Sequence, residues 1–159
     1  MVGFPVKNTL SESGTVSRGV CQTNAAGNLE SIEEHTKIES INGSIVNHND
    51  DGTEKVIAPD TPVSMNMWGF SPAIFACIRK DFEEFINRSG HDMKAFFTIP
   101  DFINGMIGKE EGKVTTYETP AVWMGVVSPD DKIQTILKIN ELIRNGHYPA
   151  RLFDVECEY

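Results

Sequence analysis

The chain has 159 residues, 40% of them hydrophobic and 23% charged, with a formal net charge of -9 and a pI of about 4.8. This is the balance of one globular domain, and its negative charge argues against nucleic acid or an anionic membrane as partner. The cysteines, Cys21, Cys77 and Cys157, are odd in number and lack CxxC or metal-ligand spacing, so free thiols are expected. With neither a long apolar run nor a signal peptide at the N-terminus, we expect a cytoplasmic domain.

The first part of the chain is predicted to be mainly β-structure. Polar stretches rich in Gly, Asn and Asp separate short apolar segments, which is typical of hairpins. The last two of these segments flank Asp50-Asp51-Gly52 and are expected to project as a separate hairpin. Strands are predicted at Val2 to Val6, Val16 to Cys21, Leu29 to Ile38, Ser44 to Val46 and Glu54 to Ile57.

One loop in this part is similar to the start of a calcium-binding loop. Asn47, Asn49, Asp51 and Gly52 have the required spacing. Such a loop needs a bidentate acid at its twelfth position, where Ala58 stands. A solvated hairpin is therefore predicted in place of a calcium site.

The rest of the chain alternates strands and helices. Val63 to Phe70 is predicted to be a strand buried on both faces, and Ser71-Pro72 to cap the helix after it. That helix should place one apolar stripe on the core, and a second helix should begin near Pro100-Asp101. The stripe consists of Ile74, Phe75, Ile78, Phe82 and Phe85.

Two more strands and a third helix complete the prediction. The strands are expected at Lys113 to Thr119 and Val122 to Val127. The helix should begin after Ser128 as N-cap and end near Asn145, before Gly146. This order predicts an α/β fold in a single domain over residues 1–159, with a mixed sheet, flanking helices and a projecting β-hairpin.

Motifs of common self-contained enzymes are absent from the sequence, including GxGxxG, GxxxxGK[ST] and GxSxG. What remains is a set of four short segments, each at or near the end of a predicted strand, where α/β sheets place ligands. Their glycine, carboxylate, hydroxyl and amide groups suit the hydroxyl groups of a hexose phosphate. The segments are Arg18-Gly19-Val20, Ile32 to His35, Val63 to Asn66 and Trp123 to Val126.

Nearly the whole chain resembles one family. NTLSESGTVSRGVC (Asn8 to Cys21), EEHTKI (Glu33 to Ile38), VSMNMWGF (Val63 to Phe70) and VWMGV (Val122 to Val126) are similar to the C-terminal half of bacterial sugar-1-phosphate nucleotidyltransferases, in the nucleotide-diphospho-sugar transferase superfamily. The resemblance implies a Rossmann-like fold whose N-terminal, NTP-binding half, with its LxAGxGxR-type loop, is absent here. The full-length protein would transfer an NMP from an NTP to a sugar 1-phosphate and release pyrophosphate.

The resemblance also implies site residues. Gly19 resembles a glycine whose backbone faces the sugar, and Glu34 a sugar-binding glutamate. His35 falls where relatives have lysine or histidine. Ser64 lies near a polar residue that contacts the sugar, with Asn66 two residues further on and expected on the same side of the strand.

Three of these positions also have a purely structural interpretation. Glu34 suits a solvated hairpin and His35 an exposed strand position, whereas Asn66 suits a buried, hydrogen-bonded position that ties down a loop. Trp68 and Trp123 suit the core or a pocket wall. Arg18 and Lys94 are the basic residues that we expect nearest a phosphate.

The metal position departs from the family. The resemblance implies Mg²⁺ as cofactor and an Asp or Asn near Gly125-Val126-Val127, none of which has a side-chain oxygen. Asp130 or Asp131 stands close by, but both fit the first turn of a helix. No metal ligand is therefore assigned.

These observations leave two functions open. The chain is either the sugar-phosphate-binding part of a nucleotidyltransferase, inactive without its N-terminal half, or a non-catalytic sugar-nucleotide-binding or interaction module. The sugar and the base stay open. Because an excised half would expose a sheet edge and an apolar face, formation of a homo-oligomer is expected.

Overall fold

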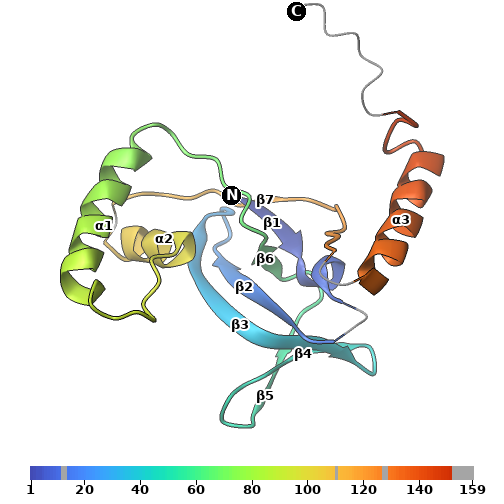
Figure 1. The fold of residues 1–159 in the computed structure, drawn as a ribbon, viewed down its shortest axis with the longest axis horizontal. Coiled ribbons are helices and arrows are strands. Elements are labelled where there is room, and N and C mark those ends of the chain that lie inside the picture. The colour runs from blue at the N-terminus through green and yellow to red at the C-terminus, as the bar shows by residue number, and fades with distance from the viewer. Residues whose placement is uncertain (12–13, 110, 127–128, 152–159) are drawn as a thin grey trace, which may run out of the picture. The chain divides into compact units, whose positions relative to one another are not determined.

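The computed structural model describes residues 1–151 apart from 12–13, 110 and 127–128. The chain divides into two compact units, Met1–Val122 and Trp123–Tyr159, and each is described by itself. Within the described residues, a mixed sheet of seven strands and three α-helices confirm the predicted α/β class (Figure 1). No helix among them is long and apolar enough to cross a membrane.

The sheet has the order β5-β4-β3-β2-β6-β1-β7. All neighbouring strands are antiparallel except β1 and β7, which are parallel. A short 3₁₀ helix, η1 (Val6–Thr9), follows the first strand. The strands are β1 (Val2–Pro5), β2 (Val16–Thr23), β3 (Leu29–Ile41), β4 (Ser44–His48), β5 (Glu54–Ile57), β6 (Pro62–Ser64) and β7 (Tyr117–Glu118).

Both predicted hairpins are confirmed. In the β2–β3 turn, the side-chain oxygen of Asn24 accepts bonds from the backbone N–H groups of Ala26 and Asn28. Asn42 and Gly43, which join β3 to β4, both have positive φ, as a tight two-residue hairpin turn requires. The β4–β5 hairpin extends from the edge of the sheet (Figure 1).

The strand predicted over Val63 to Phe70 is wrong in extent, because β6 ends at Ser64. Asn66 has a φ of 57°, a left-handed conformation that takes the chain out of the strand. The predicted strand at Lys113 to Thr119 is reduced to the two residues of β7, and 122–126 form no strand. Val127 lies outside the described residues. An apolar run forms a strand only where a neighbouring strand can pair with it, and the local sequence does not show whether such a strand is present.

Helix α1 (Ile74–Ser89) begins later than predicted. Ser71 and Pro72 form the turn before it, and Ala73 occupies the N-cap without a side-chain hydrogen bond. The predicted apolar stripe is also wrong in part: Ile74 and Ile78 pack against a core cluster, but Phe75 is 72% exposed.

Helix α2 (Ile99–Gly108) begins within one residue of its prediction. The Thr98 side chain accepts a bond from Asp101 N–H and donates one to its carboxylate, a reciprocal cap. The helix packs on β3, and the Asn104 amide binds both the N–H (2.9 Å) and the C=O (2.8 Å) of Ile32. This anchors β3 two residues before Glu34.

Two apolar clusters form the core. One contains Ile32 and Ile103, with residues from α2, and the other contains Ile38, Val6 and Val63. Ile38, Ile103, Val6 and Val63 are among the largest fully buried side chains. Because Cys21 and Val20 are neighbours on one strand yet belong to different clusters, the clusters lie on opposite faces of β2.

Helix α3 (Pro129–Arg144) belongs to the second unit and confirms the third predicted helix. Gly146, with a φ of 76°, follows its end as expected. The proposed N-cap, Ser128, lies outside the described residues, as do the side chain of Asp130 and Cys157.

Candidate functional site

A row of residues in register crosses five strands of the sheet. Glu34 of β3 pairs with Gly19 of β2, Gly19 with Ser64 of β6, Ser64 with Gly3 of β1, and Gly3 with Glu118 of β7. Directly paired residues direct their side chains to the same face. The row therefore presents carboxylate, no side chain, hydroxyl, no side chain and carboxylate in sequence. We call it the glycine row.

Gly19 lies in a narrow gap of this row. A Cβ built on it would lie 2.9 Å from Ile32 Cγ2, 3.5 Å from Ser64 Cβ and 3.8 Å from Glu34 Oε2. Packing alone therefore favours glycine here, because any side chain would have to displace Ile32. Glu34 and Ser64 lie on the two strands that flank Gly19. Glu34 is exposed, whereas Gly19 is buried.

Ser64 ends β6 and is 8% exposed. Its Oγ accepts a hydrogen bond from the backbone N–H of Asn66 at 3.2 Å. Asn66 is exposed and lies beyond the strand, so the expectation that it shares a strand face with Ser64 is wrong, and so is the alternative of a buried Asn66. The expectation assumed that side chains alternate between the two faces of a strand, but the left-handed backbone of Asn66 ends that alternation.

His35 does not join the glycine row. It pairs with Arg18, and successive residues on a strand point to opposite faces. The ring is 4% exposed, so the interpretation of His35 as an exposed strand residue is wrong. Its Nε2 lies 3.1 Å from Glu33 Oε2, close enough for an ion pair although the angles do not make a hydrogen bond, and Nδ1 has no hydrogen-bond partner among the described residues.

The carboxylate of Glu33 links this buried ring to solvent. His35 first, and then Lys55 at 3.2 Å, hold the pKa of Glu33 below its ordinary value. A buried imidazole is thus held by an exposed carboxylate, which is a structural arrangement of β3 and β5 on the face opposite the glycine row.

The basic residues expected near a phosphate lie apart from the glycine row. Arg18 points to the other face, where its guanidinium donates to the backbone oxygens of Ser17 and Thr9. Burial lowers the pKa of Arg18, and the charge of Glu34 opposes that shift. Lys94 lies in the turn after α1, where its backbone N–H binds Asp92.

A buried thiol lies on the same face as Gly19. Burial raises the pKa of Cys21 to about 12, although a backbone hydrogen bond involving Ser64 and the charge of the N-terminus act in the other direction. The Met1 ammonium donates to Thr115 O at 2.7 Å, and burial lowers its pKa. A thiol with this pKa is protonated at neutral pH and is no nucleophile there.

The far end of the glycine row adjoins a hollow of about 600 Å³. Pro5, Lys7, Asp60 and Glu118 help to line it, and Lys7 Nζ pairs with Asp60 at 2.5 Å. Three strand spacings separate β2 from β7, which amounts to about 14 Å. The hollow is therefore separate from the part of the row around Gly19.

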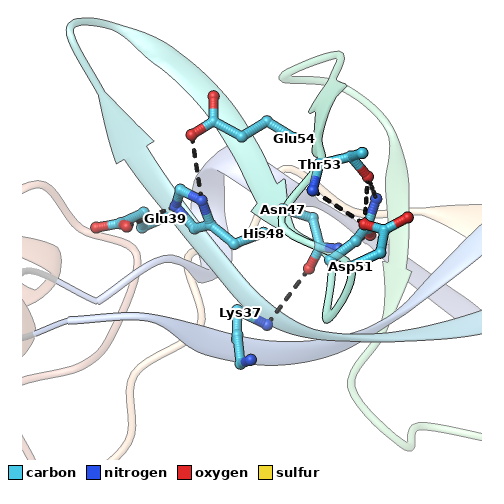
Figure 2. Close-up of polar contacts among 8 residues, drawn as sticks. Lys37, Glu39, Asn47, His48, Asp51, Thr53 and Glu54 are labelled. Atoms are coloured by element: carbon cyan, nitrogen blue, oxygen red, sulfur yellow. Dashed lines mark hydrogen bonds and ion pairs between the residues drawn. The ribbon is translucent and has the colours of Figure 1, made fainter.

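The projecting hairpin holds a separate polar cluster (Figure 2). His48 lies between two carboxylates, with Nε2 2.8 Å from Glu39 Oε1 and Nδ1 3.3 Å from Glu54 Oε1. In the adjoining turn, Asp51 accepts bonds from the N–H and the hydroxyl of Thr53, which lower the pKa of Asp51. Side chains of the loop that is similar to a calcium site thus bind one another.

The fourth predicted segment, Trp123 to Val126, belongs to the second unit and forms no strand. A Cβ on Gly125 would collide with the Trp123 ring, so packing accounts for this glycine. Gly125 and Val126 offer no side-chain oxygen, and no group of three or more His, Cys, Asp or Glu suited to a metal ion occurs in the part of the chain that the structure describes. These residues do not fit the Mg²⁺ that the resemblance implies.

The structure thus brings together Gly19, Glu34 and Ser64 and separates His35 from them. Gly3 and Glu118 share the row but were not among the predicted site residues. A glycine inside an apolar strand, such as Gly3 in Val2 to Val6, indicates that another part of the chain packs closely against the strand. The structure agrees, because a Cβ on Gly3 would lie 2.9 Å from Thr116 Cγ2. Nothing in the sequence indicated Glu118.

Comparisons with known proteins add no family. No model of a known protein family matches the chain, and no curated protein matches it.

Proposed function

We propose that this chain binds a sugar phosphate on the glycine row, with the sugar against the exposed carboxylate of Glu34 and beside Gly19 and Ser64. The observation that carries the proposal is the register Glu34–Gly19–Ser64, which sets an acceptor-only carboxylate and a hydroxyl on either side of a residue without a side chain. Vicinal sugar hydroxyls donate hydrogen bonds that a carboxylate accepts, and charged acceptors make the stronger bonds.

The rigidity of the row supports the same proposal. Glu34 follows Ile32, which Asn104 of α2 holds by two backbone hydrogen bonds. Ser64 is held by the bond from Asn66. A site on strands supported in this way is preorganised, so little binding free energy is lost to ordering it.

In the larger proposal, the chain is the sugar-binding part of a sugar-1-phosphate nucleotidyltransferase, whose other half binds the NTP. The resemblance of the motifs supports this. Because Gly125 and Val126 cannot bind a metal through side-chain oxygens, no catalytic step is assigned to the chain. The same observation favours the second candidate, a sugar-nucleotide-binding module without catalysis.

Calorimetric titration with a panel of hexose and N-acetylhexosamine 1-phosphates tests binding. Glu34→Gln keeps the shape of the side chain but removes its charge, and we expect it to weaken binding about tenfold or more, the effect of losing one charged hydrogen bond. Glu30→Gln is the matched control, because Glu30 is also exposed on β3 but lies four residues away. Its binding should equal that of the unaltered chain.

Two results would contradict the proposal: no binding of any sugar phosphate, or equal binding by the Glu34→Gln variant. A separate assay addresses catalysis. The chain alone should release no pyrophosphate from an NTP and a sugar phosphate, and measurable release would refute the view that catalysis needs another part.

A further inference from the structure

Helix α1 has one face that packs on the rest of its unit and one that does not. Ile74 and Ile78 contact the cluster around Ile103, yet no residue of α1 is fully buried. Beside that face, Phe75 is 72%, Phe82 45% and Ile86 47% exposed, although the Phe82 ring also contacts the ring of Phe97 in the same unit, with centroids 5.5 Å apart. In Figure 1 the helix lies at the outside of its unit, beyond α2.

The exposed face has the spacing of a helix–helix seam. Phe75, Arg79, Phe82 and Ile86 follow one another at intervals of four, three and four residues. Side chains at these intervals fall on one stripe of a helix and pack against the same stripe of a neighbouring helix. We call these four residues the α1 seam.

We propose that the α1 seam is an interface between two copies of this chain, paired antiparallel about a two-fold axis near the middle of the helix. In that arrangement Phe75 lies level with Ile86 of the second copy. Arg79 lies level with Phe82 and Glu83 of the second copy, where the guanidinium can stack on the ring and pair with the carboxylate. The seam is thus complementary to itself, as a two-fold interface requires.

Charge favours a second copy over a charged partner. Helix α1 carries three basic residues, Arg79, Lys80 and Arg88, and three acidic ones, Asp81, Glu83 and Glu84. It is therefore neutral within a chain whose net charge is -9. Two copies that approach through α1 therefore meet at surfaces without net charge, and such a surface favours neither a basic nor an acidic partner.

The interface is small. A helix of 16 residues is about 24 Å long, which places the contact among weak, transient interfaces. The dimer is therefore expected to form with increasing protein concentration. It does not depend on sugar binding, because the glycine row lies on the sheet and not on α1.

A charge exchange tests the pairing with the full chain, by sedimentation velocity over a concentration series reaching about 100 µM, where weak interfaces become populated. Arg79→Glu faces Glu83 of the second copy with a like charge, and Glu83→Arg faces Arg79 in the same way. Each variant alone should associate at least about tenfold more weakly than the unaltered chain. Mixed together they restore both pairs, so the mixture should form a heterodimer as stable as the original dimer.

Lys80→Glu and Glu84→Lys are the matched controls. They make equivalent charge changes next to the same residues but on the far side of the helix, and they should associate as the unaltered chain does. Circular dichroism confirms that each variant is folded. A chain that stays monomeric throughout, association that the seam variants leave unchanged, or a mixture that does not recover would each overturn the proposal.

Discussion

The centre of the sheet and helix α1 differ in how far their apolar side chains are buried. In the sheet, Ile38 and Val63 have no exposed surface, and with Val6 of η1 they form a closed core. In α1, large apolar side chains alternate between a packed face and an open one, and none is fully buried. The first arrangement holds a structure together, and the second leaves a surface that only another molecule or another part of the chain can cover.

Because of this difference, mutations can test sugar binding on the glycine row and dimerisation through the α1 seam independently. Substitutions in the sheet should act on the free energy of unfolding, and on sugar binding where they touch the glycine row. Substitutions on the open face of α1 should act on association and leave unfolding nearly unchanged.

The largest effect is expected at Ile38, which is fully buried. Ile38→Ala removes buried methyl and methylene groups and leaves a cavity, which should cost about 2–5 kcal/mol of unfolding free energy. Phe75→Ala, on the exposed face of α1, should cost less than about 1 kcal/mol. Urea unfolding followed by circular dichroism measures both, and similar losses would contradict the contrast.

An intermediate effect is expected at Gly19. The added methyl of Gly19→Ala meets Ile32 Cγ2 at 2.9 Å, which should destabilise the chain by about 1–3 kcal/mol. Gly105 provides the control, because a Cβ there meets nothing within 4 Å and Gly105 lies inside α2. Gly105→Ala should stabilise the helix by about 0.5–1 kcal/mol. Thermal unfolding measures both variants. A Gly19→Ala variant at least as stable as the unaltered chain would show that the gap at Gly19 is not tight.

A smaller effect separates the two helix starts. Thr98→Ala removes the reciprocal cap of α2 and should cost about 1 kcal/mol. Ser71→Ala should cost a few tenths at most, since Ser71 does not cap α1. Chemical denaturation measures both losses of unfolding free energy. An equal loss for Ser71→Ala and Thr98→Ala would show that Ser71 caps α1 after all.

The smallest effect concerns Glu33 and pH. Its pKa in the folded chain lies below the ordinary value of 4.5, so its contribution to stability is full above that value and is lost as pH falls through the lowered pKa. Because the side chain is exposed, the contribution is less than about 1 kcal/mol. Glu33→Gln should therefore lose slightly less stability than the unaltered chain between pH 7 and about pH 3. Identical pH profiles would show that the His35 and Lys55 contacts do not matter.

Local features of the sequence predicted the hairpins and two helix positions well. Asn42-Gly43 and the loop around Gly27 specify tight turns through positive φ, and Pro100-Asp101 marks the start of α2 because capping is a short-range interaction. The same reasoning placed a cap at Ser71 that the structure does not show, because the chain there continues through a turn to Ala73.

Features set by distant pairing were predicted less well. The apolar run after Val63 has the composition of a buried strand, but Asn66 leaves the sheet and only three residues pair. Gly19, Glu34 and Ser64 were expected together, and strand register places them in one row. Register also assigns His35 to the opposite face, and adds Gly3 and Glu118, because partner strands are not visible in a local sequence pattern.

The most direct test of the account is a two-dimensional amide NMR titration of the chain with a hexose 1-phosphate. We expect the largest shifts at the amides of Gly19, Glu34 and Ser64 and none in helix α1. Shifts confined to the hollow around Lys7 and Asp60, or none at saturating ligand, would contradict the claim that the glycine row binds the sugar.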